Sequence, residues 1–219
     1  MPYHLVPGNH DLSNAAMVED WHRRHGPTWR SFVHDDVLFL LLDTEDPPEE
    51  LPPDILERTH ELERAMAEDA AATQARVLEA VAERGSPVVL PGRAHMSDEQ
   101  LGSVHDTLAA HADVRWTFVL LHRPAWRYES AEFDRIAGRL ADRDHTVIAG
   151  HEHYYTHERI DGRDYFDLGT CGGVWLRDGP GRLDHVLWVT MTDAGPVFAN
   201  LTLDAVSYTH LRAHETEAY

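Results

Sequence analysis

Histidines in three short motifs are the residues of this chain best able to do chemistry. The motifs are Gly8-Asn9-His10-Asp11, Leu121-His122-Arg123-Pro124 and Gly150-His151-Glu152-His153. Each follows a short apolar run, so we expect each in a loop just past the carboxyl end of a strand, where open α/β sheets place their chemistry. Imidazole nitrogens and amide oxygens are suitable metal ligands. The spacing therefore predicts that three strand ends converge on one metal-binding pocket.

The last motif holds two histidines separated by one residue. On extended backbone, His151 and His153 would project to the same side, because side chains alternate between faces with a period of two. Two such imidazoles can each bind one of two metal ions spaced about 3.5–4 Å apart. A surface loop that happens to contain two histidines is the alternative for this motif taken alone.

The first two motifs contribute different ligand types. Gly8 permits an irregular backbone, Asn9 offers a hard carbonyl oxygen, and Asp11 can orient the imidazole of His10. His122 ends a very apolar run. Alone, the first motif is also compatible with an ordinary turn, and His122 with a core or rim histidine. The order and the strand-end placement of all three motifs together favour a metal site.

The composition bounds what else the chain can do. Its 219 residues, 42% of them apolar, suffice for one domain with a sizeable core. The 38 acidic residues outnumber the 19 basic ones, and the formal net charge of -19 repels nucleic acids and anionic membranes but favours a bound cation. Every basic residue is arginine, which excludes a P-loop lysine and Schiff-base chemistry. The single Cys171 excludes a cysteine-based zinc site and an internal disulfide.

Apolar runs and turn residues predict the elements that would position the motifs. Strands are expected at 3–6, 37–42, 88–90, 116–121 and 146–149, followed by strands with turns at 161–162 and 193–195 up to about residue 205. Helices are expected at 14–25, 55–84, 97–111 and 130–142. Ser97 and Gln100 match a capping box, in which Ser97 accepts from the third helical amide while Gln100 reaches back. Alternating strands and helices followed by consecutive strands predict a layered α/β fold.

The three motifs, in this order, resemble the signature of the calcineurin-like metallophosphoesterase family. That signature runs Asp-x-His, Gly-Asp-x-x-Asp, Gly-Asn-His-Asp/Glu, a lone His after a strand, and Gly-His-x-His. The last three blocks are present, and the resemblance covers roughly residues 1–205. It implies an α/β fold of the four-layer αββα sandwich type. It also implies hydrolysis of a phosphate ester, from a small molecule or a macromolecule, at a dinuclear metal centre.

The resemblance also implies roles for individual residues. Asn9, His122 and His151 would bind one ion and His153 its neighbour. His10 would be the acid that protonates the leaving oxygen, and Asp11 would hold His10 in place. The two ions would be drawn from Mn, Fe, Zn or Ni, which suit imidazole, amide and carboxylate ligands without thiolate. Three further residues are candidates for substrate binding: Arg123, Trp126 and Tyr155.

The first two blocks of the family signature have no counterpart. We therefore expect a catalytic domain that is incomplete at its N-terminus, with its first strands missing, a helical insertion at about 45–84, and little activity of its own. Asp43, at the end of a strand, is expected to play a supporting or structural role rather than to be a ligand. Residues 206–219 resemble a translated sequencing-adapter end and are expected to be a non-native tail that packs on nothing.

Two other functions stay open at this point. A non-catalytic scaffold on the same fold would use its surface for protein contacts, and a mononuclear metal-binding protein would need the order of the three motifs to be coincidental. No signal peptide or membrane-spanning run is present, the longest apolar run being 37–42. A cytoplasmic location is the default expectation. Neither the choice between monoester and diester nor the oligomeric state follows from the motifs.

Overall fold

The computed structural model describes residues 3–48, 53–84, 93–128, 130–175, 177–203 and 212–213. Its helices are α1 (Ala15–His25), α2 (Pro53–Glu68), α3 (Ala70–Arg84), α4 (Asp98–Ala110) and α5 (Ala131–Leu140). Its strands are β1 (Arg30–His34), β2 (Val37–Leu41), β3 (Trp116–Leu120), β4 (His145–Ala149), β5 (Thr156–Ile160), β6 (Arg163–Asp167), β7 (His185–Thr192), β8 (Gly195–Thr202) and β9 (Arg212–Ala213). The chain divides into two compact units. The first comprises Met1–His60, Leu90–His151 and His157–Phe166, and the second Glu61–Val89, Glu152–Thr156 and Asp167–Tyr219.

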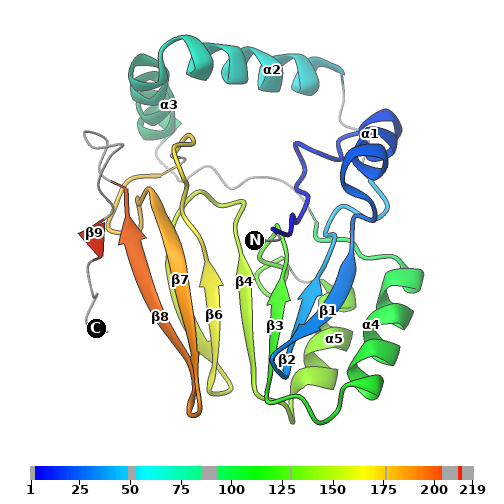
Figure 1. The fold of residues 1–219 in the computed structure, drawn as a ribbon. Coiled ribbons are helices and arrows are strands. Elements are labelled where there is room, and N and C mark those ends of the chain that lie inside the picture. The colour runs from blue at the N-terminus through cyan, green and yellow to red at the C-terminus, as the bar shows by residue number, and fades with distance from the viewer. Residues whose placement is uncertain are drawn as a thin grey trace. The chain divides into compact units, whose positions relative to one another are not determined.

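Six strands form a mixed sheet in the order β1-β2-β3-β4-β6-β5 (Figure 1). β1 is antiparallel to β2, whereas β2, β3 and β4 run parallel. Backbone pairing continues past the strand ends, because Leu42 N donates to Leu120 O at 2.8 Å. Likewise, Gly150 N donates to His122 O at 2.9 Å. The residues that follow β2, β3 and β4 are therefore held side by side at one end of the sheet.

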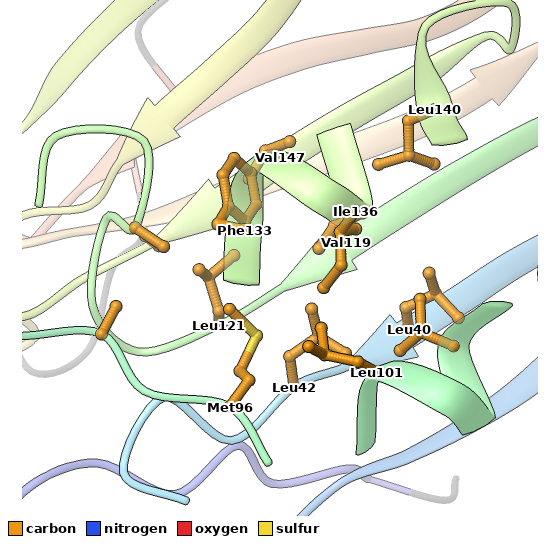
Figure 2. Close-up of a cluster of buried hydrophobic side chains, with 14 of the residues drawn as sticks. Leu40, Leu42, Met96, Leu101, Val119, Leu121, Phe133, Ile136, Leu140 and Val147 are labelled. Carbon is orange, nitrogen blue, oxygen red and sulfur yellow. The ribbon is translucent and has the colours of Figure 1, made fainter. Parts of the chain in front are cut away.

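A hydrophobic core lies between β2, β3 and β4 and the helices α4 and α5 (Figure 2). On α5, Phe133, Ile136 and Leu140 lie on one face because they are spaced by three and four residues, and each is at most 2% exposed. Val119 of β3 and Val147 of β4 are fully buried against them. Burying a side chain the size of phenylalanine contributes about 2–3 kcal/mol. This packing fixes the strands whose ends carry the second and third histidine motifs.

The N-terminus of α4 confirms one half of the expected capping box. Ser97 Oγ accepts from Gln100 N at 3.2 Å. The other half is wrong, because the Gln100 side chain does not reach back to Ser97. Its Oε1 accepts from Asp43 N at 2.9 Å, and its Nε2 donates to Asp43 O at 3.0 Å. Gln100 is fully buried, so its amide must be satisfied inside the protein. It joins the start of α4 to the end of β2.

Two expected elements differ. Residues 3–6 form no strand but an irregular segment in which His4 stacks on Phe32 of β1, with ring centroids 4.1 Å apart. A strand needs a backbone ladder to a neighbour, and a ring contact does not replace it. The helix expected at 55–84 is divided at Asp69, whose carboxylate accepts from Ala72 N at 3.0 Å and so begins α3. The strand expected at 88–90 lies outside the described residues.

The second unit contains the β7–β8 hairpin, paired antiparallel over eight residues of each strand. Its turn at 193–195 and the turn at Asp161-Gly162 between β5 and β6 confirm the expected positions. Of the tail 206–219, the structure describes only β9, which pairs with Leu201 and Thr202 of β8. The chain is thus an α/β protein with a six-strand mixed sheet plus a hairpin. Among the described helices, none is both long and apolar enough to cross a membrane.

Candidate metal centre

Three side-chain atoms, one from each of three separate segments, meet in the first unit. Asn9 Oδ1 lies 2.8 Å from His122 Nε2 and 3.1 Å from His151 Nδ1. The two ring nitrogens are 3.0 Å apart. His122 and His151 follow the adjacent parallel strands β3 and β4, while Asn9 lies in the turn before α1. The expected convergence of Asn9, His122 and His151 is therefore present, although only two of the three segments follow a strand.

The chemistry of this triangle of atoms fits a cation. An imidazole nitrogen carries either a hydrogen or a lone pair, so it cannot both donate and accept. At most two of the three contacts among Asn9 Oδ1, His122 Nε2 and His151 Nδ1 can therefore be hydrogen bonds. In the third contact, two lone pairs or two N–H groups face and repel each other. Three ligands at right angles around an ion with bonds of about 2.1 Å would lie about 3 Å apart, as these atoms do. The amide oxygen and two imidazoles thus match adjacent ligand positions of one ion.

A tight turn fixes Asn9. Gly8 N donates to Asp11 Oδ2 at 2.9 Å, and Asp11 N donates to Gly8 O at the same distance. Ser13 Oγ donates to the carbonyl of Asn9. Asp11 thus stabilises the turn that carries Asn9 and His10. Both His10 and Asp11 are exposed to solvent.

A buried ion pair supports His151 from the other side. Arg123 Nη1 lies 3.1 Å from His151 Nε2. The same guanidinium donates to both carboxylate oxygens of Glu45, at 2.5 and 3.1 Å, and the side chains of Arg123 and Glu45 are 7% and 8% exposed. Burial raises the pKa of Glu45, although the Arg123 charge acts in the opposite direction. Arg123, expected to bind substrate, forms an ion pair with the Glu45 carboxylate and contacts His151.

The Arg123 contact also fixes where His151 holds its hydrogen. A guanidinium only donates, so His151 Nε2 accepts and a neutral ring carries its hydrogen on Nδ1. Ligation through Nδ1 requires the opposite tautomer, with the hydrogen on Nε2 facing Arg123. Metal binding at this nitrogen and the Arg123 hydrogen bond are therefore alternatives.

The expectation for His151 and His153 assumed an extended backbone, which the structure does not have there. His151 and His153 have φ values of 77° and 51°, in the left-handed region, and residues 151–154 form bends rather than a strand. The period-two argument therefore does not apply. His153 belongs to the second unit, where its Nδ1 donates to the carbonyl of Val174. A backbone carbonyl on one ring nitrogen leaves the lone pair of a neutral ring on Nε2, the arrangement usual in metal-ligating histidines.

The two aromatic candidates for substrate binding have structural surroundings. Trp126 packs in the core of the first unit, with ring centroids 5.2 Å from Tyr165 and 6.4 Å from Phe133. Tyr155, in the second unit, stands edge-on to the buried His185 at 5.1 Å.

Two acidic residues after β2 are buried, and one of them, Glu45, is connected to His151 through Arg123. Asp43 is 2% exposed and accepts from Glu45 N at 2.8 Å, and burial raises its pKa to about 6. Glu45 is the supporting residue that the sequence reasoning missed. A carboxylate just past β2 lies beside the residues just past β3 in a parallel pair, so finding it requires the order of the strands in the sheet. Among the residues that the structure describes, no group of three or more His, Cys, Asp or Glu side chains is arranged to hold a metal.

In comparisons with known proteins, no family model and no curated sequence matches this chain. The resemblance to the metallophosphoesterases therefore rests on the three motifs themselves.

Proposed function

We propose that this chain is the catalytic domain of a calcineurin-like metallophosphoesterase, which hydrolyses a phosphate ester. The observation that carries the proposal is the triangle of Asn9 Oδ1, His122 Nε2 and His151 Nδ1, with sides of 2.8, 3.0 and 3.1 Å. The finer fold that we propose is the four-layer αββα sandwich of that family. The mixed sheet with α4 and α5 on one face supports it, as does the separate hairpin.

In this proposal, each residue has a defined task. Asn9, His122 and His151 hold one ion, and Nε2 of His153, in the second unit, is assigned to a second ion. Bound ions would polarise the phosphoryl group and acidify the attacking water. His10, exposed beside Asn9, protonates the leaving oxygen, and Asp11 keeps the turn that presents it. We expect low turnover from the chain itself, since the described triangle lacks the carboxylate that would bridge two ions.

Metal titration tests the proposal directly. Chain stripped with a chelator is titrated calorimetrically with Mn²⁺ and Zn²⁺, and hydrolysis of an aryl phosphate monoester and diester is followed in added manganese. We expect one ion to bind, with affinity reduced about tenfold or more in His122→Ala because a ligand is lost. His105→Ala is the matched control, since His105 lies on α4 with its side chain 49% exposed. Absence of binding to the unsubstituted chain, or equal affinity in both variants, would contradict the proposal.

A non-catalytic scaffold on the same fold is the second candidate. The observation that favours it is that the described residues form no cluster of three or more His, Cys, Asp or Glu side chains. A chain that binds neither ion, yet unfolds cooperatively, would support the scaffold.

A further inference from the structure

Two arginines in the second unit stack on aromatic rings in the same loop region. The guanidinium carbon of Arg177 lies 4.0 Å from the ring centroid of Tyr154, and that of Arg182 lies 4.3 Å from the ring centroid of Trp175. The side chains are similarly exposed, at 30% for Arg177 and 34% for Arg182. Arg177 and Arg182 thus share the same stacking arrangement and similar exposure. They differ in the hydrogen-bond partners of their N–H groups.

One donor of Arg182 has an acceptor, whereas two donor atoms of Arg177 have none among the residues that the structure describes. Arg182 Nη1 donates to Asp178 Oδ1 at 3.1 Å. Arg177 Nε and Nη2 are buried and, within the described part of the chain, make no hydrogen bond. The carboxylate of Glu152 lies 3.9 Å from Arg177 Nη2, which is an ion-pair distance but too long for a hydrogen bond. A buried donor without an acceptor is unfavourable, so Arg177 is expected to have a use for these two groups.

Neighbouring residues pack around Tyr154, the ring on which Arg177 stacks, and around the adjacent Trp175. Gly179 and Gly181 pack against the ring of Tyr154, and a Cβ atom on Gly179 would come within 2.6 Å of the Tyr154 hydroxyl. Gln74 of α3 clamps Trp175, accepting from its N at 2.8 Å and donating to its O at 2.9 Å. Arg177 therefore stacks on a ring that is itself packed by its neighbours, and a guanidinium restrained in this way loses less entropy on binding a ligand.

We infer that Arg177 is an anion subsite that binds phosphoryl oxygens. Nε and Nη2 form one edge of the guanidinium, and that edge matches two oxygens of a phosphate in a bidentate pair. Arg177 also contacts Glu152 and Tyr154, the residues on either side of His153. That the anion is the phosphoryl group of a substrate rests on the proposed function. Nε and Nη2 are themselves buried, so an anion reaches this edge only when the Glu152 carboxylate, 3.9 Å from Nη2, moves aside.

Binding of inorganic phosphate to the full chain, stripped of metal with a chelator, tests this inference. We expect Arg177→Gln to weaken phosphate binding about tenfold or more, in line with the loss of a charge-assisted pair, and Arg177→Lys to restore part of it. Arg182→Gln removes the same charge from the same loop and is expected to change the affinity less than twofold. Glu152→Gln is expected to tighten binding, because it removes the competing carboxylate. Titration by ³¹P NMR gives the affinities, and circular dichroism shows that each variant is folded.

Two results would overturn the inference. One is the absence of phosphate binding to the unsubstituted chain at millimolar concentrations. The other is an equal loss in Arg177→Gln and Arg182→Gln, which would indicate only the general effect of charge. The proposed function is tested separately by metal titration. Metal binding without Arg177-dependent phosphate binding overturns the subsite alone, whereas Arg177-dependent phosphate binding by a chain that binds no metal overturns the proposed function alone.

Discussion

Gly8 lies against the face of the His122 imidazole. A Cβ atom at position 8 would come 2.7 Å from Cε1 and Nδ1 of that ring, closer than real Cβ contacts allow. Nε2 of the ring contacts Asn9 and His151, so a shift of the ring away from a new Cβ atom would disturb both contacts. The first histidine motif thus needs glycine because of the second motif, 114 residues further along the chain.

Gly8→Ala is therefore expected to displace His122 and to weaken metal binding about tenfold or more, with a loss of roughly 1–3 kcal/mol in the free energy of unfolding from overpacking. Gly138→Ala is the control. Gly138 lies on the exposed side of α5 with nothing within 4 Å of a new Cβ, so this variant is expected to gain about 1 kcal/mol. Urea unfolding and metal titration measure both effects. Unchanged metal affinity in Gly8→Ala would contradict the structural role of the glycine.

His10 and His151 are expected to respond differently to removal. His10→Ala should lower the small turnover of the chain further, as loss of a general acid does, and leave metal affinity within about twofold. His151→Ala should lower both, because it removes one corner of the ligand triangle. Metal titration of the two purified variants separates the roles. Equal metal loss in both would rule out His10 as the acid.

Asp43 is expected to make stability depend on pH. Burial raises its pKa to about 6, so between about pH 4 and pH 6 the folded chain holds a proton that the unfolded chain has lost. The free energy of unfolding therefore falls as pH rises through this range, by about 3 kcal/mol from this group.

Asp43→Asn removes the titration but keeps an oxygen that can accept from Glu45 N. The difference in unfolding free energy between variant and unsubstituted chain, measured in urea from pH 4 to pH 7, should grow in favour of the variant as pH rises. A constant difference across that range would show that Asp43 has an ordinary pKa.

The Glu45–Arg123 pair is expected to be strongly coupled. Arg123→Met leaves a buried carboxylate without its partner and should lower the free energy of unfolding by about 3–5 kcal/mol. The double variant Glu45→Gln/Arg123→Met should be less destabilised than the sum of the two single variants. Asp98 and Arg135 form an exposed pair at 3.2 Å, for which the same cycle should give less than about 1 kcal/mol. Additive losses at Glu45 and Arg123 would show that their contact carries little energy.

Most of the elements around the site follow from local sequence. The apolar run at 116–121 and the capping serine Ser97 predict β3 and α4 well, because burial and helix capping act within a few residues. The segment at 3–6 has an apolar strand-like pattern as well. It forms no strand because pairing depends on a neighbour that local pattern cannot specify.

Part of the candidate site could also be predicted from the sequence. His122 and His151 could be brought together from sequence because each follows a strand, and parallel neighbours end at the same place. The Glu45–Arg123 pair depends on the order of strands in the sheet, which no single motif contains. The φ values of His151 and His153 were also beyond reach, because a left-handed backbone at histidine follows from the surrounding structure and not from residue preference.

At His151 and His153, the left-handed backbone means that the residue best for folding stability differs from the residue needed for metal binding. A β-carbon in this region is unfavourable by roughly 1–2 kcal/mol, which glycine avoids and asparagine tolerates. In a library varied at positions 151 and 153, selection for soluble expression alone should enrich glycine and asparagine, while selection for metal retention should keep histidine. The two histidines would then mark a place where stability is given up for function, and the pair of enrichment profiles would reveal this without any knowledge of a substrate.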